Sequence, residues 1–203
     1  DGLAASLVLV TVVSLGVLAW AGGDATAFGI LSILAAIVLS FLTFNLRLSG
    51  RALVFMGDAG SMFLGFVLAW FLIKFSQGED RLLAPVTALW VFALPLIDTV
   101  TMMVRRVLRR RSPFMADREH FHHILLAAGL NPKQTLTVMV ALSATAACVG
   151  LTGHFLQVPE NVMFFGFLGL FFLHFWLIMK AWKVKRFLAR PLNHSGDLGD
   201  ERS

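Results

Sequence analysis

The chain has 203 residues, of which 58% are hydrophobic and only 14% are charged, and its mean hydropathy is +0.79. Soluble domains are close to half apolar and a quarter charged, so this composition excludes an ordinary soluble domain and indicates a bilayer as the solvent. The net charge of +5 is compatible with nucleic-acid binding, but the placement of the basic residues favours a topological origin. Cys148 is the only cysteine, which excludes an intrachain disulfide.

Six segments are apolar enough to cross a membrane as helices, each of which needs about 20 mainly apolar residues. The third segment is short, but it reaches a full span if Gly60 and Ser61 start the helix. The sequence therefore predicts an all-α, polytopic membrane protein whose membrane domain covers residues 1–182. The predicted spans are residues 3–20, 27–44, 62–75, 83–103, 136–155 and 162–179.

The longer polar segments and the basic residues predict the orientation of these helices. If the N-terminus is cytoplasmic, the loops 45–59 and 104–135 and the tail 183–203 all lie in the cytoplasm with most of the arginines and lysines. Only Lys74 and Arg81 are then near the opposite face, as the positive-inside rule requires. We therefore expect both termini in the cytoplasm, a disordered polar tail, and contact of the basic residues with anionic lipids rather than nucleic acid.

A first group of candidate residues lies where the loop 45–59 meets the third span. Gly57 and Gly60 permit a ligand to approach the backbone closely, and the helix N-terminus offers free N–H groups to a phosphate. Asp58 is suited to Mg²⁺, which takes oxygen ligands from carboxylates and substrate phosphates. Alternatively, Asp58 is a helix N-cap and the glycines only pack helices together. Asn45, at the start of the same loop, is a further polar candidate.

Three histidines within four residues, His120, His122 and His123, form a second group. On a helix, His120 and His123 would share a face and His122 would point about 200° away from His120, so the spacing does not predict a three-histidine zinc site. Imidazoles can instead donate to phosphate oxygens or transfer protons near neutral pH. Alternatively, these histidines belong to a solvated interfacial loop without a catalytic role.

Charged residues at the ends of two predicted spans are further candidates. Arg105 and Arg106 can bind phosphate groups by bidentate hydrogen bonds, although for any single arginine a topology anchor is the better interpretation. Asp98 lies one to two turns before the end of its span, where an ionisable group is either functional or in polar contact with another helix. Asp1 places a carboxylate at the cytoplasmic mouth of the first span, with little specificity by itself.

Taken in chain order, these motifs resemble those of the polyprenyl-phosphate N-acetylhexosamine-1-phosphate transferases. The resemblance extends over essentially the whole chain, and the ordered set is far more specific than any one motif. Phe121 stands where the MurNAc-pentapeptide branch has an unbroken histidine triplet, and this favours the bacterial branch that uses UDP-GlcNAc. The motifs that carry the resemblance are the runs 1–3, 55–61, 95–98, 105–114 and 117–123.

The resemblance implies an enzyme of about eleven membrane helices, of which this sequence carries the last six and begins inside a family motif. The expected reaction is transfer of GlcNAc-1-phosphate from UDP-GlcNAc to undecaprenyl phosphate at the cytoplasmic face of the bacterial inner membrane. It would initiate synthesis of a surface polysaccharide. Another UDP-N-acetylhexosamine donor and a non-catalytic transport or assembly subunit stay open as alternatives, and this piece alone is expected to be inactive.

The resemblance also implies roles for the candidate residues, with Mg²⁺ or Mn²⁺ as the metal. Asp58 is the expected metal ligand and is expected to be catalytic together with Asp1 and His120. The expected partners are the UDP-sugar, undecaprenyl phosphate and membrane lipids, without nucleic acid, and an oligomer is compatible with this set. The residues expected to bind substrate are Asn45, Gly57, Gly60, Ser61, Arg105, Arg106, His122 and His123.

Overall fold

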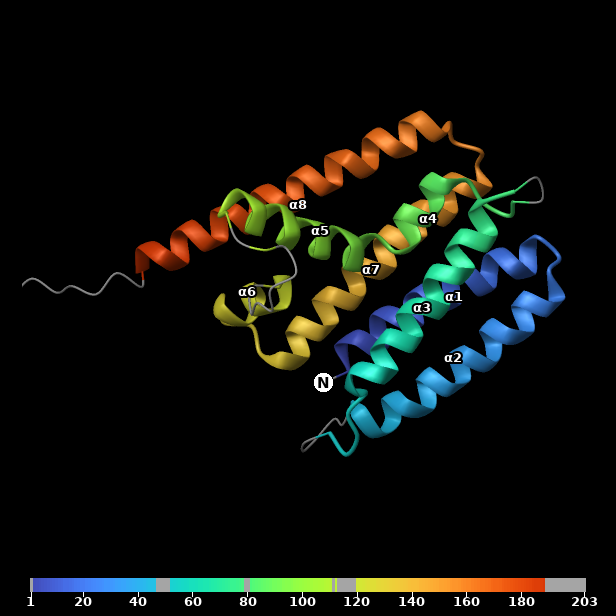
Figure 1. Ribbon diagram of the computed structural model, residues 1–203, viewed down its shortest axis with the longest axis horizontal. Helices are drawn as coiled ribbons and strands as arrows, with labels where there is room; N and C mark the ends of the chain where they lie inside the picture. Colours follow the sequence, from blue (N-terminus) through green and yellow to red (C-terminus); the bar gives the residue numbers. More distant parts are fainter. Residues whose placement is uncertain (1, 47–51, 79–80, 111, 113–119, 189–203) are drawn as a thin grey trace, which may run out of the picture.

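The chain folds into α-helices throughout the part that the computed structural model describes, residues 2–46, 52–78, 81–110, 112 and 120–188 (Figure 1). This confirms the predicted all-α class. The helices form one bundle, in which the longest connections are those from α2 to α3 and from α5 to α6. In chain order they are α1 (Leu3–Ala21), α2 (Ala25–Asn45), α3 (Gly57–Ser76), α4 (Pro85–Val91), α5 (Ala93–Leu108), α6 (Phe121–Ala127), α7 (Pro132–Phe155) and α8 (Glu160–Leu188).

Five of the described helices are long and apolar enough to cross a membrane, and α4 with α5 makes a sixth crossing if the two count as one broken span. These crossings correspond to the six predicted spans. α3 begins at Gly57 rather than at residue 62, so the short third span becomes a helix of 20 residues. α8 continues to Leu188, so the segment 183–203, expected to be disordered, begins as helix; its remainder lies outside the described residues.

The fourth predicted span is not the single helix that its apolar run predicts, because α4 and α5 meet at an angle of 86°. Phe92 lies between them with φ −110° and ψ 23°. Pro95 explains the position of the break: it has no N–H for the carbonyl of Val91, and its ring would clash with that carbonyl in a continuous helix. Val91 is the last residue of α4, and Pro95 falls in the first turn of α5, where no N–H is needed.

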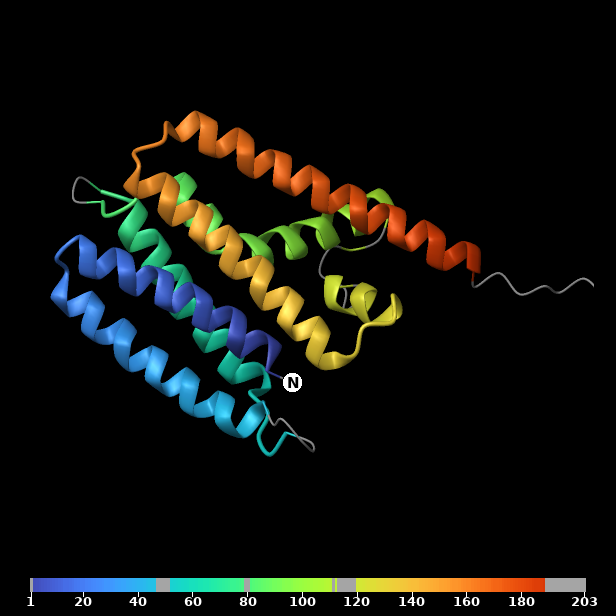
Figure 2. The ribbon, with the colours of Figure 1, turned by 180° about the vertical axis from the view of Figure 1, so that it is seen from behind.

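The core of the bundle is built around α1, which contacts α2, α3, α4 and α7 and buries Val12 and Leu15 completely (Figure 2). A second core cluster surrounds Trp90 on α4, whose Nε1 donates to the backbone carbonyl of Met163 at 3.0 Å. Gly150 on α7 permits this approach, because a Cβ there would lie 2.5 Å from the Cβ of Trp90. The broken span is therefore held between α7 and α8.

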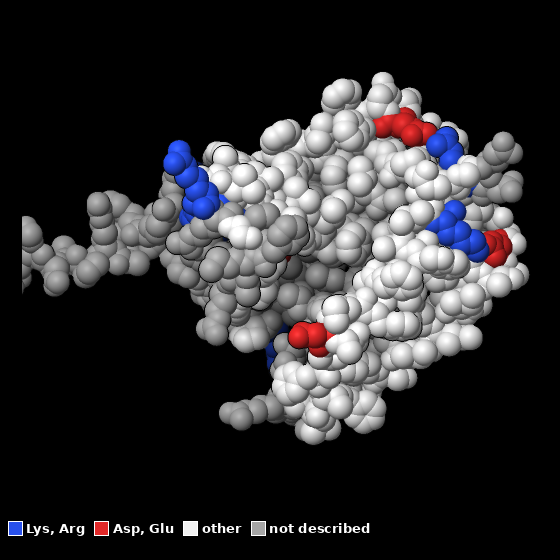
Figure 3. Space-filling model, in the orientation of Figure 1, with Lys and Arg blue, Asp and Glu red and all other residues white. Residues whose placement is uncertain are grey.

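Large apolar side chains cover much of the outer surface. Ile33 on α2, Phe66 on α3 and Phe172 on α8 are each more than half exposed, and many neighbours on the same helices are similar. Figure 3 shows a broad uncharged surface with the charged side chains at its edges. A surface of this kind is stable in lipid and not in water, so the bundle is a membrane protein.

The two ends of the bundle differ in what they carry. The N-terminus, the α2–α3 connection and the starts of α6 and α7 lie at one end, called here the N-terminal end, and the α1–α2, α3–α4 and α7–α8 connections lie at the other, the far end (Figures 1 and 2). At the far end Lys74 pairs with Asp24 at 3.1 Å and Arg81 with Glu160 at 3.2 Å. Lys74 and Arg81 are thus on one side, as the charge pattern predicts, and the assignment of the N-terminal end to the cytoplasm stays a prediction.

Candidate active site

The first turn of α3 presents Asp58 at the N-terminal end of the bundle. Gly57, the first residue of α3, has φ +65°, a left-handed conformation that favours glycine. Gly60 lies against Met56, since a Cβ there would come 2.9 Å from the Cγ of Met56. The hydroxyl of Ser61 donates to the carbonyl of Asp58 at 2.9 Å. Four predicted residues are therefore gathered in one turn; the backbone favours glycine at position 57, and the side chain of Met56 leaves little room for a Cβ at position 60.

Asp58 is exposed and does not cap the helix. The cap position is Met56, and no side chain caps this end of α3, so the interpretation of Asp58 as an N-cap is wrong. A carboxylate in the first turn is stabilised by the positive end of the helix dipole. Among the described residues no side chain bonds the carboxylate of Asp58, which can therefore bind a ligand from outside the protein.

Asn45, the last residue of α2, is buried and ties two parts of the site together. Its Oδ1 accepts from the N–H of Gly2 at 2.6 Å, and its Nδ2 donates to the carbonyl of Val54 at 2.6 Å. The first bond fixes the start of α1 and the second fixes the segment that leads into α3. Both polar atoms of Asn45 bond the main chain, which gives it a structural role, and the substrate contact that the sequence predicts for it stays a prediction. Asp1, which precedes Gly2, lies outside the described residues.

The three histidines lie together at the start of α6. His120 precedes the helix as its N-cap residue, with φ −60° and ψ 156°, and its ring stacks on that of His122 with centroids 6.0 Å apart. The rings of His122 and His123 are 4.1 Å apart. His120 is not in the helix, so the division between two helix faces, which holds for three histidines on one helix, does not apply. Burial, followed by the nearby imidazoles of His123 and His120, lowers the pKa of His122 and favours its neutral form.

Asp98 on α5 holds the start of α6 from outside. Its Oδ2 lies 3.0 Å from Nδ1 of His120, and its Oδ1 accepts from the N–H of Phe121 at 3.1 Å. Polar contact with another element, one of the two interpretations left open for Asp98, is thus present. His174 on α8 approaches from another side, with Nε2 3.9 Å from Oδ1 of Asp98. His174 is not among the predicted residues, although an ionisable group inside an apolar span is a candidate by default.

The arginines at the end of α5 divide by burial. Arg105 is 1% exposed, whereas Arg106 is half-buried and Arg110 is exposed. A topology anchor has to reach water or lipid headgroups, so that interpretation fits Arg110 and does not fit Arg105. Arg105 lies about two helical turns after Asp98, on the same face of α5. The structure therefore singles out Arg105 from a run of arginines that look alike in the sequence.

The first turn of α3 fits a divalent cation that arrives with a phosphate substrate. In the part of the chain that the structure describes, no three His, Cys, Asp or Glu side chains are grouped to hold a metal ion by themselves. Mg²⁺ is commonly held by one or two carboxylates together with substrate phosphates. The exposed carboxylate of Asp58 meets that requirement at a helix N-terminus, where phosphate oxygens are also stabilised.

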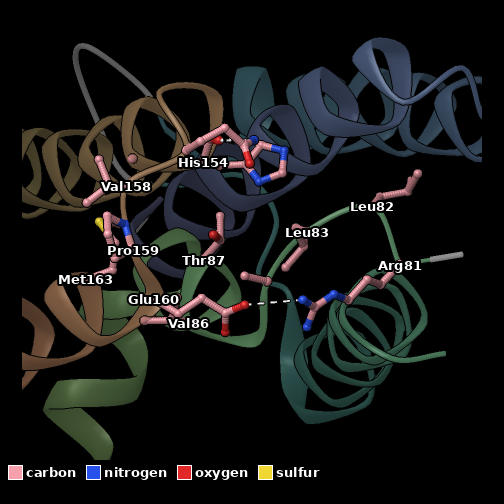
Figure 4. Close-up of a pocket in the computed structure, with 13 residues that line it drawn as sticks. Arg81, Leu82, Leu83, Val86, Thr87, His154, Val158, Pro159, Glu160 and Met163 are labelled. Atoms are coloured by element: carbon pink, nitrogen blue, oxygen red, sulfur yellow. Dashed lines mark hydrogen bonds and ion pairs between the residues drawn. The ribbon is translucent and has the colours of Figure 1, made fainter. Parts of the chain in front are cut away.

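A polar pocket at the far end of the bundle is separate from these groups. It has a volume of about 330 Å³ and lies where α4 begins, α7 ends and α8 begins (Figure 4). Arg81 donates to Glu160 beside it, and both side chains are about half exposed, so their ion pair stabilises the fold by about 1 kcal/mol at most. None of the predicted site residues lines this pocket, which leaves the N-terminal end as the candidate active site.

Comparison with known proteins places the chain in a family. Residues 1–76 match glycosyl transferase family 4. The chain is 40% identical to the undecaprenyl-phosphate alpha-N-acetylglucosaminyl 1-phosphate transferase of Escherichia coli K12, over 94% of this chain and 52% of that protein. Proteins with the same name from Haemophilus influenzae and Yersinia pestis are 42% and 38% identical, over 75% and 94% of this chain and 44% and 53% of theirs. No solved structure matches.

The chain spans about half the length of the curated relatives that it matches. The family match over residues 1–76 contains α1 to α3, and with them Asn45 and the Asp58 turn. The similarity to the relatives continues through the histidines of α6 and covers nearly the whole chain. The identity to these relatives confirms the family that the ordered motifs predict: the chain belongs to the family of the undecaprenyl-phosphate alpha-N-acetylglucosaminyl 1-phosphate transferases.

Proposed function

We propose that the chain is part of an enzyme that transfers GlcNAc-1-phosphate from UDP-GlcNAc to undecaprenyl phosphate and releases UMP. Relatives named for this activity, at about 40% identity, support the proposal. The observation that carries it is that Asp58 and the histidines of α6 lie at the same end of an apolar helical bundle. A lipid phosphate anchored in the membrane and a water-soluble nucleotide sugar can meet only at such an end.

In this proposal the first turn of α3 binds the diphosphate of UDP-GlcNAc. The free N–H groups of the helix and the positive end of its dipole are complementary to phosphate, and Gly57 and Gly60 let the substrate approach the backbone. Asp58 holds Mg²⁺, or Mn²⁺ in its place, which neutralises charge on the diphosphate and on the departing UMP. Asp1 supports the substrate or the metal from the segment that Asn45 fixes.

The histidines and one of the arginines bind the phosphates from the other side of the site. His122 and His123 each offer a ring N–H donor, and His120 offers one at Nε2 when its ring is protonated there; the lowered pKa of His122 favours its neutral form. Arg105 or Arg106 supplies a permanent positive charge with a planar set of donors that matches a phosphate.

The chemical step joins two phosphates. An oxygen of the lipid phosphate attacks the β-phosphorus of UDP-GlcNAc, a new P–O bond forms, and the bond from that phosphorus to the bridging oxygen breaks. UMP leaves with the electron pair of the broken bond. No proton has to move if the lipid phosphate attacks as the dianion, so the residues of the protein mainly bring two anions together and stabilise the leaving group.

The proposed enzyme lies in the bacterial inner membrane with its N-terminal end facing the cytoplasm, where nucleotide sugars are made. The bacterial relatives and the placement of Lys74 and Arg81 at the far end support this orientation. A donor with another N-acetylhexosamine is one alternative. A non-catalytic transport or assembly subunit is the other, and it is less well supported, because Asp58 and the histidines gather at one end of the bundle rather than along a path through it.

An exchange assay tests the proposal. The full-length protein that carries this sequence is placed in membranes with undecaprenyl phosphate, Mg²⁺ and UDP-GlcNAc, and the transfer of label from UMP into UDP-GlcNAc is measured. We expect exchange that requires both the lipid and the divalent cation. No exchange by the wild type would overturn the transferase proposal. Faster exchange with UDP-GalNAc or another donor would keep the reaction and replace the sugar.

A further inference from the structure

The carboxylate of Asp98 is nearly buried, with 12% of its side chain exposed, and it lies within an apolar broken span. Such burial is strongly unfavourable for a charge unless polar partners surround it. Two hydrogen bonds do so at the start of α6, from Nδ1 of His120 at 3.0 Å and from the N–H of Phe121 at 3.1 Å. Nε2 of His174 on α8 lies 3.9 Å from the carboxylate, beyond hydrogen-bond distance, so Asp98 bonds α5 to α6 and lies beside α8.

The start of α6 depends on this carboxylate. His120 occupies the N-cap position, but its own side chain does not cap the helix. Oδ1 of Asp98 instead accepts from the N–H of Phe121, the first helical residue. A residue of α5 thus caps the N-terminus of α6. Because Oδ2 of the same carboxylate meets the ring of His120, one group fixes both the backbone and the imidazole at this point.

The contact with Asp98 also decides which nitrogen of His120 carries the proton. An ionised carboxylate can only accept hydrogen bonds, so the proton between the two groups belongs to Nδ1 of His120. A neutral ring then has its lone pair on Nε2, the nitrogen turned away from Asp98. The His120 side chain is 39% exposed, so its ring runs from the buried carboxylate toward the surface.

His174 supports the arrangement from α8. It is 8% exposed, and its ring meets that of Phe121 edge-on at 4.9 Å. A cavity of about 330 Å³ with mostly apolar walls lies beside these two rings, between α4, α5, α7 and α8. The walls on that side are apolar, and the imidazole of His174 is the polar group that lies nearest to the carboxylate of Asp98 there, at 3.9 Å.

We propose that Asp98 is the positioning residue of the histidine loop. It holds the ring of His120 by Nδ1, so that Nε2, when the ring takes up a second proton there, donates to a substrate phosphate, and His174 packs beside the carboxylate. Asp98 acts through His120 and does not itself touch the substrate. The proposal rests on the proposed function, because that function provides the phosphates on which His120 acts.

A double-mutant cycle in the full-length enzyme tests the proposal. Asp98→Asn and His120→Gln are each expected to lower kcat about 10- to 100-fold, the loss expected for a charge-assisted hydrogen bond at a reacting group, with KM for both substrates within about threefold. The double variant should be no slower than His120→Gln alone, because without the ring there is nothing to position. Additive losses, or wild-type activity in Asp98→Asn, would overturn the proposal.

The tautomer of His120 distinguishes the proposal from a purely structural role of Asp98, which would leave the tautomer unchanged. With ¹⁵N-labelled histidine, NMR of the wild type at pH 8 should show His120 protonated at Nδ1. In Asp98→Asn the amide oxygen keeps the Phe121 N–H and the NH₂ group faces the ring, so the proton should move to Nε2. The same tautomer in both proteins would refute the assignment. Because this measurement needs no turnover, it stays informative even if the proposed reaction is not found.

His174 supplies a second variant in case Asp98→Asn does not fold. His174→Phe keeps a ring against Phe121 and removes the nitrogen, so kcat should fall about threefold to tenfold, and this loss should vanish in the His120→Gln background. Persistence of the full loss in that background would contradict the role of His174. Glu160→Gln, the same acid-to-amide change at the far end of the bundle, is the matched control and should retain wild-type kinetics.

Discussion

Replacing Asn45 by alanine should remove the hydrogen bonds that connect the start of α1 with the segment that leads into α3. The change removes two hydrogen bonds of 2.6 Å, to the N–H of Gly2 and the carbonyl of Val54. The first is buried, and an unsatisfied buried group costs about 1–3 kcal/mol; the second is partly exposed, so water can replace it and its net loss is about 0.5–1.5 kcal/mol. We therefore expect Asn45→Ala to reduce the free energy of unfolding by about 1.5–4.5 kcal/mol.

Asn45→Asp separates the two bonds. A carboxylate still accepts from the N–H of Gly2, but it cannot donate to the carbonyl of Val54 and faces it with a negative charge. The segment that leads to Asp58 should shift while the start of α1 stays fixed. The exchange activity should fall, and the Mg²⁺ concentration that gives half-maximal exchange should rise, because Asp58 is displaced from the substrate diphosphate.

Reversible unfolding in mixed detergent micelles measures the loss of unfolding free energy in Asn45→Ala. Amide hydrogen exchange of peptides from residues 2–8 and 52–60 shows where the structure is loosened. In Asn45→Ala both peptides should exchange faster, and in Asn45→Asp mainly the second. An unfolding free energy within about 0.5 kcal/mol of wild type, the range of an ordinary surface substitution, together with unchanged amide exchange would refute the structural role of Asn45.

Two further predictions concern α3 and α6. Gly57→Ala forces φ +65° on a residue with a Cβ, so it should destabilise the first turn of α3 by about 1–2 kcal/mol and lower exchange activity. Gly65→Ala, in open space on the same helix, should be neutral or stabilising. Equal activity losses in the two variants would contradict the reasoning. His122 has a pKa held below its ordinary value of 6.5, so as the pH falls below 6.5 the unfolded chain takes up a proton before the folded one and stability declines. Between pH 7 and 5 the unfolding midpoint of the wild type should therefore fall more steeply than that of His122→Asn, and parallel curves would refute the effect of burial.

The membrane crossings could be predicted from the sequence because each depends on a local property, the length of an apolar run. The break between α4 and α5 is also encoded locally, by Pro95, but the apolar run continues through it and hides the change of direction. Hydrophobicity shows that a segment belongs in lipid and not whether it is straight. The Gly57–Ser61 turn could likewise be predicted from the sequence, because its residues are contiguous and the left-handed backbone that favours glycine at position 57 belongs to the same segment.

The rest of the site depends on how the helices assemble. Nothing in the spacing of Asp98 and His120 shows that they meet, because the contact requires α6 to fold back against α5. Arg105 is distinguished from its neighbours only by the face of α5 that turns inward. His174 could have been chosen from the sequence as an imidazole within an apolar span. Its place beside Asp98 could not be predicted, because the two meet only when α8 packs beside α5.

In the proposed function the reaction takes place at the end of the bundle that carries Asp58 and His120. The most direct test compares label exchange between UMP and UDP-GlcNAc in three variants of the full-length enzyme: Asp58→Asn, His120→Gln and Glu160→Gln. We predict losses of at least about 100-fold for Asp58→Asn and about 10- to 100-fold for His120→Gln, with wild-type exchange in Glu160→Gln. Wild-type exchange in the first two variants, with loss in Glu160→Gln, would contradict the claim.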